Sequence, residues 1–487
     1  MNGIIKGLGV ALLMATLASC GGGGSLTGTT TSGSGSKGGG GGNNNTPPGI
    51  PNSIDFVLPA TTAGTVIALQ GAGAVTNAQV TFQVNDASNT GVGGVNVTFS
   101  LVPSTGDATL TTTTGTTAAN GQVSTFVVSG TEHYSVSVLA TVNTPSGVKT
   151  ALSNALTITT GIPTENNFAM ASANLTAGNA ADTLGITDVI TVQLSDRFNN
   201  PVLNNTAVAF VANSGQITGQ CLTLNGNCTV TWTSSGLPNA NDGLHLPGRV
   251  EILAYTVGEE SFDDADGDGV FDHNDVFTKF VSGTTVDSFV EPTNPSVDDI
   301  GEVYLDGAEL GHYISGDFFH DFNADGLRNG PTGKFFGFGC KGTATVSCGG
   351  PSIEIGKQIC VELSTSGAII GVTPGTAFGA GNTLTVGSGN SVTFTVSDAN
   401  GQALAKGSTV SLVQSGVNGF TVNTPVNLPF SYPDSGCGAN TQSFTVTITP
   451  VVPAPTSPPP AGQLQLQVVT SGTGGAQTNS PVITLLP

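Results

Sequence analysis

Apolar and polar residues alternate with a period of two through most of the chain after residue 50, in short runs rich in Val, Thr, Ile and Phe. Gly, Asn, Asp and Pro separate these runs. A period of two places every second side chain on the same face of a β-strand, whereas no long helical pattern follows the first twenty residues. The pattern therefore predicts an all-β protein.

One combination of strand, turn and strand occurs three times along the chain. Its copies are VTFQVNDASNTGVGGVNVTF at 80–99, ITVQLSDRFNNPVLNNTAVAF at 190–210 and VTFTVSDANGQALAKGSTVSL at 392–412. In each copy the first strand ends at an aspartate, Asp86, Asp196 or Asp398, whose short polar side chain can cap a turn. Three such copies predict tandem domains.

These segments resemble the bacterial immunoglobulin-like domain of the invasin and intimin type, in which a strand ending in Asp-x-x-Gly/Asn leads to a Val-rich second strand. The resemblance covers most of residues 52–257 and 353–487 and implies tandem immunoglobulin-like β-sandwiches. The second copy departs from the repeat, because its last strand runs into an acidic, loop-rich insert, which is predicted to bind calcium. The predicted division is a signal peptide at 1–19, a lipidated cysteine and Gly/Ser/Asn-rich tether at 20–50, immunoglobulin-like domains at 51–161 and 162–257, the insert at 258–350 and a third domain at 351–487.

The first twenty residues resemble a bacterial lipoprotein signal peptide. Lys6 precedes an apolar run that is too short to cross a bilayer, and Leu17-Ala18-Ser19-Cys20 matches the lipobox. The resemblance implies cleavage before Cys20 and acylation of that cysteine, which would hold the protein at a membrane. Because Gly21 is not the Asp that retains many lipoproteins at the inner membrane, a lipid-anchored protein of the outer membrane, exposed at the cell surface, is expected. The alternative is an ordinary secretory signal with an incidental cysteine.

Charge is scarce and almost all of it is negative. Only 9% of the residues are charged, and 11 Lys and Arg face 32 Asp and Glu, for a formal charge of -21. This balance disfavours nucleic acid and acidic membrane surfaces as partners and favours cations. Eighteen of the 32 acids fall between Glu259 and Asp325, where Lys279 is the only Lys or Arg.

A twelve-residue stretch in this acidic region has the spacing of a calcium loop. Oxygen ligands are expected from Asp264, Asp266, Asp268, the Val270 carbonyl, Asp272 and Asp275, with Gly269 permitting the sharp turn at position 6. The stretch resembles the EF-hand loop and, with Asp at position 12, more closely the dockerin loop. It departs from both because strands flank it, and extracellular modules of this kind bind calcium at about 10⁻⁴ to 10⁻³ M.

A second stretch repeats only the first half of this pattern. Its expected ligands are Asp321, Asn323, Asp325, Leu327 and Asn329, while Thr332 takes position 12. For both stretches the alternative is a solvated acidic turn that binds no metal.

Six cysteines follow Cys20, an even number in an exported chain, where disulfides persist. Cys221 and Cys228 flank a hairpin turn at Asn225-Gly226, and their pairing requires a four-residue loop, since a two-residue loop would set Thr223 opposite Cys228. The remaining Cys340, Cys348, Cys360 and Cys437 allow three pairings. Proximity favours Cys340 with Cys348, which leaves Cys360 to meet Cys437 within the last sandwich.

The function expected from these features is a non-enzymatic envelope protein that presents immunoglobulin-like domains for adhesion or scaffolding, stabilised by calcium, with a surface protein or glycan as its possible ligand. One alternative is a carbohydrate-binding module, but only 6% of the residues are aromatic and Trp232, in a strand, is expected in the core. Another is a hydrolase that uses Asp317 and Asp321 with His312 or His320. Calcium coordination explains these carboxylates more simply.

Overall fold

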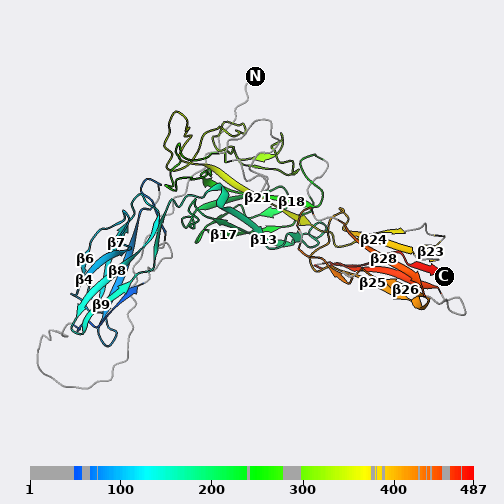
Figure 1. Ribbon diagram of the computed structural model, residues 1–487, viewed down its shortest axis with the longest axis horizontal. Helices are drawn as coiled ribbons and strands as arrows, with labels where there is room; N and C mark the ends of the chain where they lie inside the picture. The colour runs from blue at the N-terminus through cyan, green and yellow to red at the C-terminus, as the bar shows by residue number, and fades with distance from the viewer. Residues whose placement is uncertain are drawn as a thin grey trace, which may run out of the picture. The chain divides into compact units, whose positions relative to one another are not determined.

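The computed structural model describes residues 49–487 except 58–65, 74, 238–241, 278–297, 375–378, 380, 387–389, 426–427, 435, 439–440, 452–460, 473 and 487. The predicted signal peptide and nearly all of the tether, Cys20 included, lie outside the described residues. Strands and loops make up the described chain, with 3-10 turns at Glu165–Asn167 and Val417–Gly419 (Figure 1). No helix in this part of the chain is long and apolar enough to cross a membrane.

Two sheets form the first sandwich. One sheet has the order β1 (Ser53–Val57), β3 (Asn77–Asn85), β7 (Gln122–Val128) and β5 (Thr109–Leu110). The other has the order β2 (Val66–Ala68), β10 (Leu156–Thr159), β8 (Tyr134–Thr144), β4 (Asn96–Val102) and β6 (Thr114–Thr116), with β9 (Gly147–Leu152) paired to β8.

The second sandwich repeats this topology. Its first sheet has the order β11 (Phe168–Ser172), β13 (Thr187–Leu194), β17 (Asn227–Thr233) and β15 (Gln216–Ile217). The second sheet has the order β12 (Thr176–Ala177), β21 (Ile353–Leu363), β18 (Arg249–Gly258), β14 (Ala207–Ala212) and β16 (Gln220–Leu222).

The third sandwich has the same order again. One sheet contains β22 (Ile369–Pro374), β24 (Asn390–Ser397), β28 (Gln442–Pro450) and β26 (Phe420–Asn423). The other contains β23 (Thr383–Thr385), β31 (Ile483–Leu486), β29 (Gly462–Val469), β25 (Thr409–Ser415) and β27 (Phe430–Ser431), with β30 (Gln477–Asn479) on β29. The all-β prediction and the tandem immunoglobulin-like sandwiches are confirmed.

Period-two alternation places the core of each sandwich between its sheets. In β3, for example, Val80, Phe82 and Val84 are buried while Gln79 is exposed. Each sandwich has its own cluster of buried apolar residues. Trp232 is fully buried in the second of these cores and its Nε1 donates to the Ser214 carbonyl at 2.8 Å, so its expected place in the core is confirmed.

The three repeated aspartates close the same turn. Oδ1 of Asp196 accepts hydrogen bonds from the backbone N–H groups two and four residues later, at 3.0 and 2.9 Å, as do Oδ1 of Asp86 and of Asp398 in their copies. A short side chain that accepts from its own following backbone stabilises a turn between two strands. The predicted turn is therefore present in all three sandwiches.

One predicted domain boundary is wrong. β21 pairs with β18 from Ile353 to Glu362 and also pairs in parallel with β12. It therefore occupies the place in the second sandwich that β10 and β31 occupy in the first and third. It completes the second sandwich, so the third sandwich does not begin at residue 351. The acidic insert is an enlarged connection between the last two strands of the second sandwich, and its described residues include a small sheet of β19 (Tyr304–Leu305) and β20 (Phe318–Phe319).

The described structure contains the disulfides Cys221–Cys228, Cys340–Cys348 and Cys360–Cys437. The loop assumed for the first pair is wrong: Leu224 and Asn227 bond each other across the two-residue turn at Asn225-Gly226. The strands on either side of this turn, β16 and β17, belong to opposite sheets of the sandwich. The disulfide therefore joins the two sheets, and the cysteines need not lie opposite each other in a hairpin. Cys360 lies in β21, so its bond to Cys437 links the second sandwich to the third rather than closing within the last one.

Candidate calcium loops in the acidic insert

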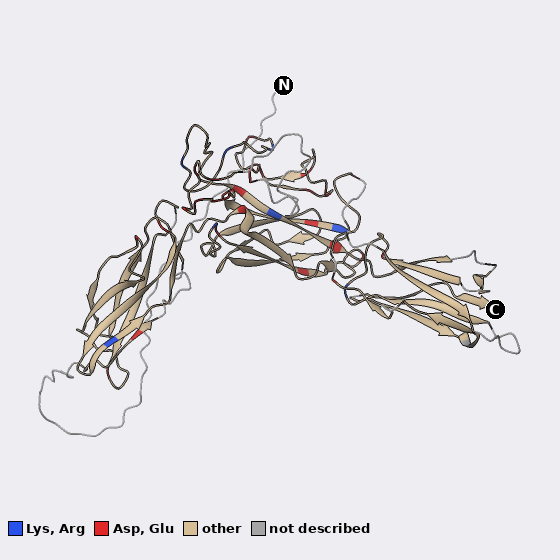
Figure 2. Cartoon of the chain, viewed as in Figure 1, with Lys and Arg blue, Asp and Glu red and all other residues tan. Residues whose placement is uncertain are grey.

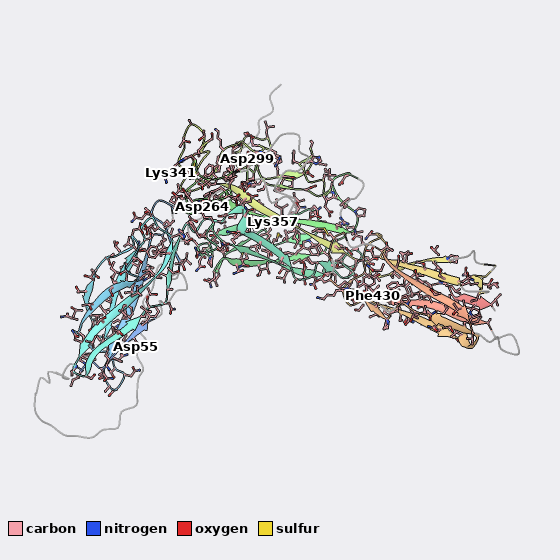
Figure 3. The ribbon with its side chains drawn as sticks, in the orientation of Figure 1. Asp55, Asp264, Asp299, Lys341, Lys357 and Phe430 are labelled. Carbon is pink, nitrogen blue, oxygen red and sulfur yellow. A yellow bond between two sulfur atoms is a disulfide. The ribbon has the colours of Figure 1, made fainter. Side chains whose placement is uncertain are left out.

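The insert covers the outer face of the β18–β21 pair. On these strands Val250, Ile252 and Val361 face the core, whereas Leu253 faces outward and packs against Tyr304 of the insert. Figure 2 shows acidic residues on these strands and in the insert above them. Figure 3 labels Asp264, Asp299 and Lys341 among the insert's side chains.

The outward positions of the covered strands include three buried glutamates. Burial raises the pKa of Glu251 well above its ordinary value, that of Glu354 to about 7, and that of Glu362 to about 8. In the insert itself, burial raises the pKa of Glu260 to about 9, although both of its carboxylate oxygens accept backbone hydrogen bonds. The covered face therefore holds carboxyl groups that each require a proton or a positive partner.

The first predicted loop brings three of its carboxylates together. One oxygen from each of Asp264, Asp266 and Asp268 lies within 4.8 Å of the others, and all three residues are exposed. Gly269 has a φ of +71°, which allows the sharp turn after the third aspartate. An antiparallel bridge between Asp263 and Val276 closes the loop, so paired backbone and not helices flanks it.

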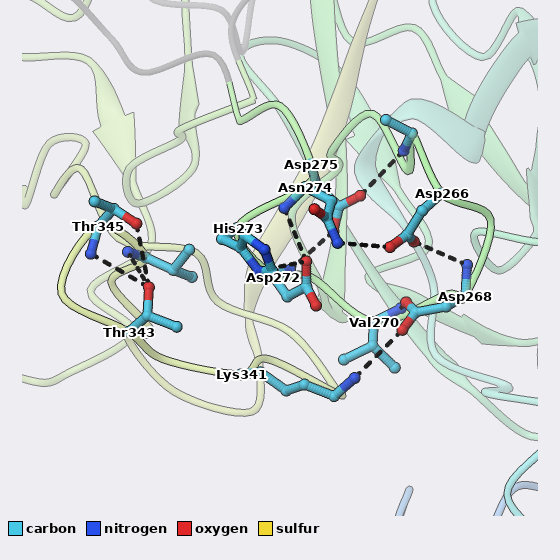
Figure 4. A network of polar contacts seen from close by, with 12 residues as sticks. Asp266, Asp268, Val270, Asp272, His273, Asn274, Asp275, Lys341, Thr343 and Thr345 are labelled. Atoms are coloured by element: carbon cyan, nitrogen blue, oxygen red, sulfur yellow. Dashed lines mark hydrogen bonds and ion pairs between the residues drawn. The ribbon is translucent and has the colours of Figure 1, made fainter.

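Backbone donors hold these carboxylates in place, and Figure 4 shows the bonds of Asp266 and Asp268. Asp264 accepts from the N–H groups of Gly267 at 2.8 Å and Gly269 at 2.9 Å, and Asp268 accepts from Val270 at 2.7 Å. Lys341 Nζ lies 3.3 Å from the second oxygen of Asp268. The loop is therefore ordered by its own hydrogen bonds, and a single lysine offsets part of its charge.

The later predicted ligands of this loop, Asp272 and Asp275, also accept backbone hydrogen bonds but do not join the three converging carboxylates. Asp275 accepts from Ala265 N at 3.0 Å and Asp272 N at 2.8 Å, so both of its carboxylate oxygens cap backbone groups, while Asp272 accepts from Asn274 N at 2.9 Å. Neither residue belongs to the group of three converging carboxylates in the described chain. The structure therefore brings together the first half of the predicted ligand set.

A buried ion pair connects this loop to the sandwich. Arg197 donates through Nε to Glu259 Oε1 at 2.8 Å and through Nη2 to Oε2, and the Glu259 side chain is fully buried. Arg197 Nη1 also donates to the Gly269 carbonyl at 3.0 Å, and Nη2 to the Phe338 carbonyl at 2.9 Å. Arg197 was not among the residues predicted from the sequence, although it directly follows the repeated Asp196 and is one of only 11 Lys and Arg in the chain.

An aromatic cluster supports the same loop from inside the insert. Phe335 is fully buried, and its ring centroid lies 4.7 Å from that of Phe271 and 5.3 Å from that of Phe262. The Cys340–Cys348 disulfide follows it, and Cys340 packs on the cluster. The insert thus has a small core of its own next to the first loop.

The second predicted loop has the same local turn. Gly326 has a φ of +82° and donates to Asp321 Oδ2 at 2.7 Å, as Gly269 donates to Asp264. Leu327 N donates to Asp325 Oδ1 at 2.8 Å, and the amide of Asn329, bonded to Oδ2 at 2.9 Å, lowers the pKa of Asp325. Asn323 Oδ1 accepts from Asp325 N at 2.9 Å.

Glu302 anchors this second loop and was also missed. Its carboxylate accepts from the backbone N–H groups of Phe322 at 3.0 Å and Asn329 at 2.9 Å. Thr332, at position 12, donates its backbone N–H to Asp299 at 3.0 Å. The second loop therefore has two carboxylates of its own and a supporting glutamate behind it.

The residues proposed for acid–base chemistry take separate partners. Asp317 accepts from Ile314 N at 2.8 Å and lines a cavity of about 280 Å³ with His245, whereas Asp321 belongs to the second loop. His320 Nδ1 lies 3.0 Å from Glu354, and His312 Nδ1 lies 3.1 Å from the Leu310 carbonyl. Burial raises the pKa of Asp317, and the nearby His312 and His245 act on the same carboxyl in the opposite direction.

Comparison with known proteins identifies neither a family model nor a curated protein that matches the chain. Among solved structures the chain is similar to the Escherichia coli adhesin FdeC, at 12% identity over 90% of this chain and 99% of that one, with a TM-score of 0.29. It is also similar to the D0-D1 domain of intimin, at 17% identity over 42% of this chain and 90% of that one, with a TM-score of 0.19. The Yersinia pseudotuberculosis adhesin InvE is similar at 15% identity over 67% of this chain and 60% of that one, with a TM-score of 0.18.

Proposed function

We propose that the chain is a lipid-anchored, non-enzymatic protein of the bacterial outer membrane that presents its immunoglobulin-like domains at the cell surface, for adhesion or scaffolding, with calcium stabilising the acidic insert. The observation that supports the calcium site most is the gathering of three exposed aspartates on a connection of the second sandwich. The resemblance of the repeated segments to invasin-type domains supports the adhesive role. A surface protein or glycan is the proposed ligand.

Calcium fits the donors of the first loop. Asp264, Asp266 and Asp268 offer hard oxygens from one short turn, and calcium takes six to eight of them. The ion would replace the repulsion among three neighbouring carboxylates with attraction to a common charge. Asp321 and Asp325 would hold a second ion with fewer charges, and therefore more weakly.

Replacing Asp266 and Asp268 together with asparagine should weaken the stronger calcium site at least about tenfold, because two of its three charges are lost. Isothermal titration of the purified chain with calcium measures this, and melting with calcium and with chelator should show a smaller calcium-dependent rise in Tm. Asp55→Asn, an exposed aspartate in β1, is the control and should bind calcium as the native chain does. Equal calcium affinity in the native chain and the double variant would contradict the proposed site.

The anchor is tested by Cys20→Ser, which removes the thiol that would be acylated. We expect loss of fatty-acid labelling and a shift of the protein from the membrane fraction to the soluble fraction, since two or more acyl chains are needed for stable attachment. Ser19→Ala keeps a small residue before Cys20 and should remain in the membrane. Cleavage of the native protein by protease added to intact cells would support surface exposure, and labelling of Cys20→Ser would refute acylation at that cysteine.

A further inference from the structure

A buried carboxyl group lies under the insert with one of its oxygens unbonded. Glu251, in β18, is 2% exposed, and its neighbours Val250 and Ile252 face the core, so its side chain lies on the face that the insert covers. Its Oε1 has no hydrogen-bond partner among the described residues. A buried carboxylate in this position costs folding free energy, whereas a protonated carboxyl group carries no charge and costs much less.

The insert places a second acid beside this one. A carboxylate oxygen of Glu309 lies within 4.8 Å of a carboxylate oxygen of Glu251. Burial, followed by the charge of Glu309, raises the pKa of Glu251 well above its ordinary value, and Asp306 acts in the same direction. Two carboxyl groups at this separation favour the state in which one of them keeps a proton.

The arginine nearest to Glu251 along β18 is shared between two other acids. Arg249 donates Nη1 to Glu309 at 2.6 Å, and its charge also acts on Glu362, its partner across the strands. The charges that act most on Glu251, from Glu309 and Asp306, are both negative. Arg249 therefore holds Glu309 in place without neutralising Glu251.

The uncharged groups around Glu251 come from the two neighbouring strands. In β14, the side chain of Asn213 accepts the backbone N–H of Glu251 at 3.0 Å. In β21, Cys360 lies directly opposite Glu251 but is bonded to Cys437, and Gln358 donates Nε2 to Glu251 Oε2 at 2.7 Å. These groups supply no charge, so a proton is what neutralises the carboxyl group.

One turn of the insert is attached to the strands through the same groups. Gln358 also donates Nε2 to the Asp306 carbonyl at 2.9 Å and accepts the Asp306 N–H at 2.9 Å. The Asp306 carboxylate accepts from the backbone N–H groups four and five residues later, at 3.1 and 2.7 Å, which closes the turn. Glu309, inside that turn, has a φ of +54°, a conformation that a glutamate keeps only when its contacts fix it.

We propose that Glu251, Glu309 and Asp306 form a pH-sensitive carboxyl cluster that attaches the insert to the second sandwich. At low pH a proton on Glu251 lets its carboxyl group lie beside that of Glu309, and the turn at 306–311 stays against the strands. When the proton leaves, a negative charge is confined next to two others, and the turn moves away. None of the three acids is a candidate calcium ligand, so the cluster does not depend on the proposed calcium sites.

The direction of the pH dependence follows from the two positions of the turn. With the turn open, Glu251 is solvated and releases its proton near its ordinary pKa of 4.5, whereas with the turn closed the raised pKa keeps the proton on to higher pH. The closed position is therefore favoured most below about pH 4.5. As the pH rises toward the raised pKa, the ratio of closed to open turns should fall by up to about tenfold for each pH unit.

Hydrogen exchange of the purified chain in chelator, at about pH 5 and about pH 7, tests this cluster. Protection factors, which correct for the intrinsic effect of pH on exchange, should fall at least about tenfold at 306–311 across this range in the native chain. Glu251→Gln keeps the shape of the side chain and an acceptor for Gln358 but has no proton to lose. Protection in this variant should therefore be the same at both pH values.

Glu354→Gln is the matched control, because it replaces another buried glutamate of the covered face with the same neutral amide. The fall in protection at 306–311 should persist in this variant. Equal protection at the two pH values in the native chain would overturn the proposal. A fall of the same size in Glu251→Gln would overturn it as well, since another group would then hold the proton.

Urea unfolding followed by Trp232 fluorescence gives an independent measurement of the same proton. The stability of Glu251→Gln relative to the native chain should be greater at about pH 7 than at about pH 5, because only the native chain must bury a charge or keep a proton as the pH rises. A difference between the two chains that does not change with pH would contradict the role of Glu251.

Discussion

Replacing Arg197 with methionine is expected to cost about 3–5 kcal/mol of folding free energy, because it leaves the carboxylate of Glu259 buried without its counter-charge. The side chains of this pair are 8% and 0% exposed, so solvent screens little of the interaction. Arg197 also donates to the carbonyls of Gly269 and Phe338, which would lose their donor. Urea unfolding followed by Trp232 fluorescence measures the loss, since Trp232 lies in the core of the same sandwich.

Two further variants show whether the cost arises from the unpaired acid. Lys149→Met removes an exposed base from β9 and should change stability by no more than about 0.5 kcal/mol. Combining Arg197→Met with Glu259→Gln removes both charges and should be less destabilising than Arg197→Met alone. If Arg197→Met unfolded at the same urea concentration as Lys149→Met, the ion pair would contribute no measurable stability.

Local pattern was sufficient to predict most of the fold. Alternation identified the strands, and the repeated Asp86, Asp196 and Asp398 identified three domains because each caps its own turn through hydrogen bonds only two and four residues away. The assignment of β21 failed because its partner β18 lies on the far side of the insert. A strand just before the third repeat resembles the start of that domain, and only pairing with a distant strand shows which sheet it joins.

In the candidate site too, contacts within a short segment were predictable from the sequence and contacts between distant segments were not. The spacing of Asp264, Asp266 and Asp268 was predictable because one short turn brings them together. The pairing of Arg197 with Glu259 was not, because 62 positions separate them along the chain. Asp275, the ligand predicted at position 12, accepts backbone N–H groups with both oxygens and lies outside the group of three converging aspartates. A linear motif identifies possible ligands, while the folded loop decides which of their carboxylates converge.

Phe335→Ala should destabilise the insert by about 3–5 kcal/mol, because it removes a fully buried ring from the small core around Phe262 and Phe271. That core supports one flank of the first loop, so the loop should open and calcium affinity should fall. Hydrogen exchange should show faster exchange at 262–277 and 335–348, with little change in the first and third sandwiches, which have cores of their own.

The control for this prediction is Phe126→Ala, in β7 of the first sandwich, where the ring is 40% exposed. It removes the same atoms, but little buried contact is lost, and calcium binding should be unchanged. Uniformly faster exchange across all three sandwiches in Phe335→Ala would mean that the insert and the sandwiches unfold together. Faster exchange confined to the insert, with weaker calcium binding, would show that the aromatic core positions the aspartates. Phe335 is not itself a candidate ligand, because its side chain has no oxygen and it lies far along the chain from residues 264–268.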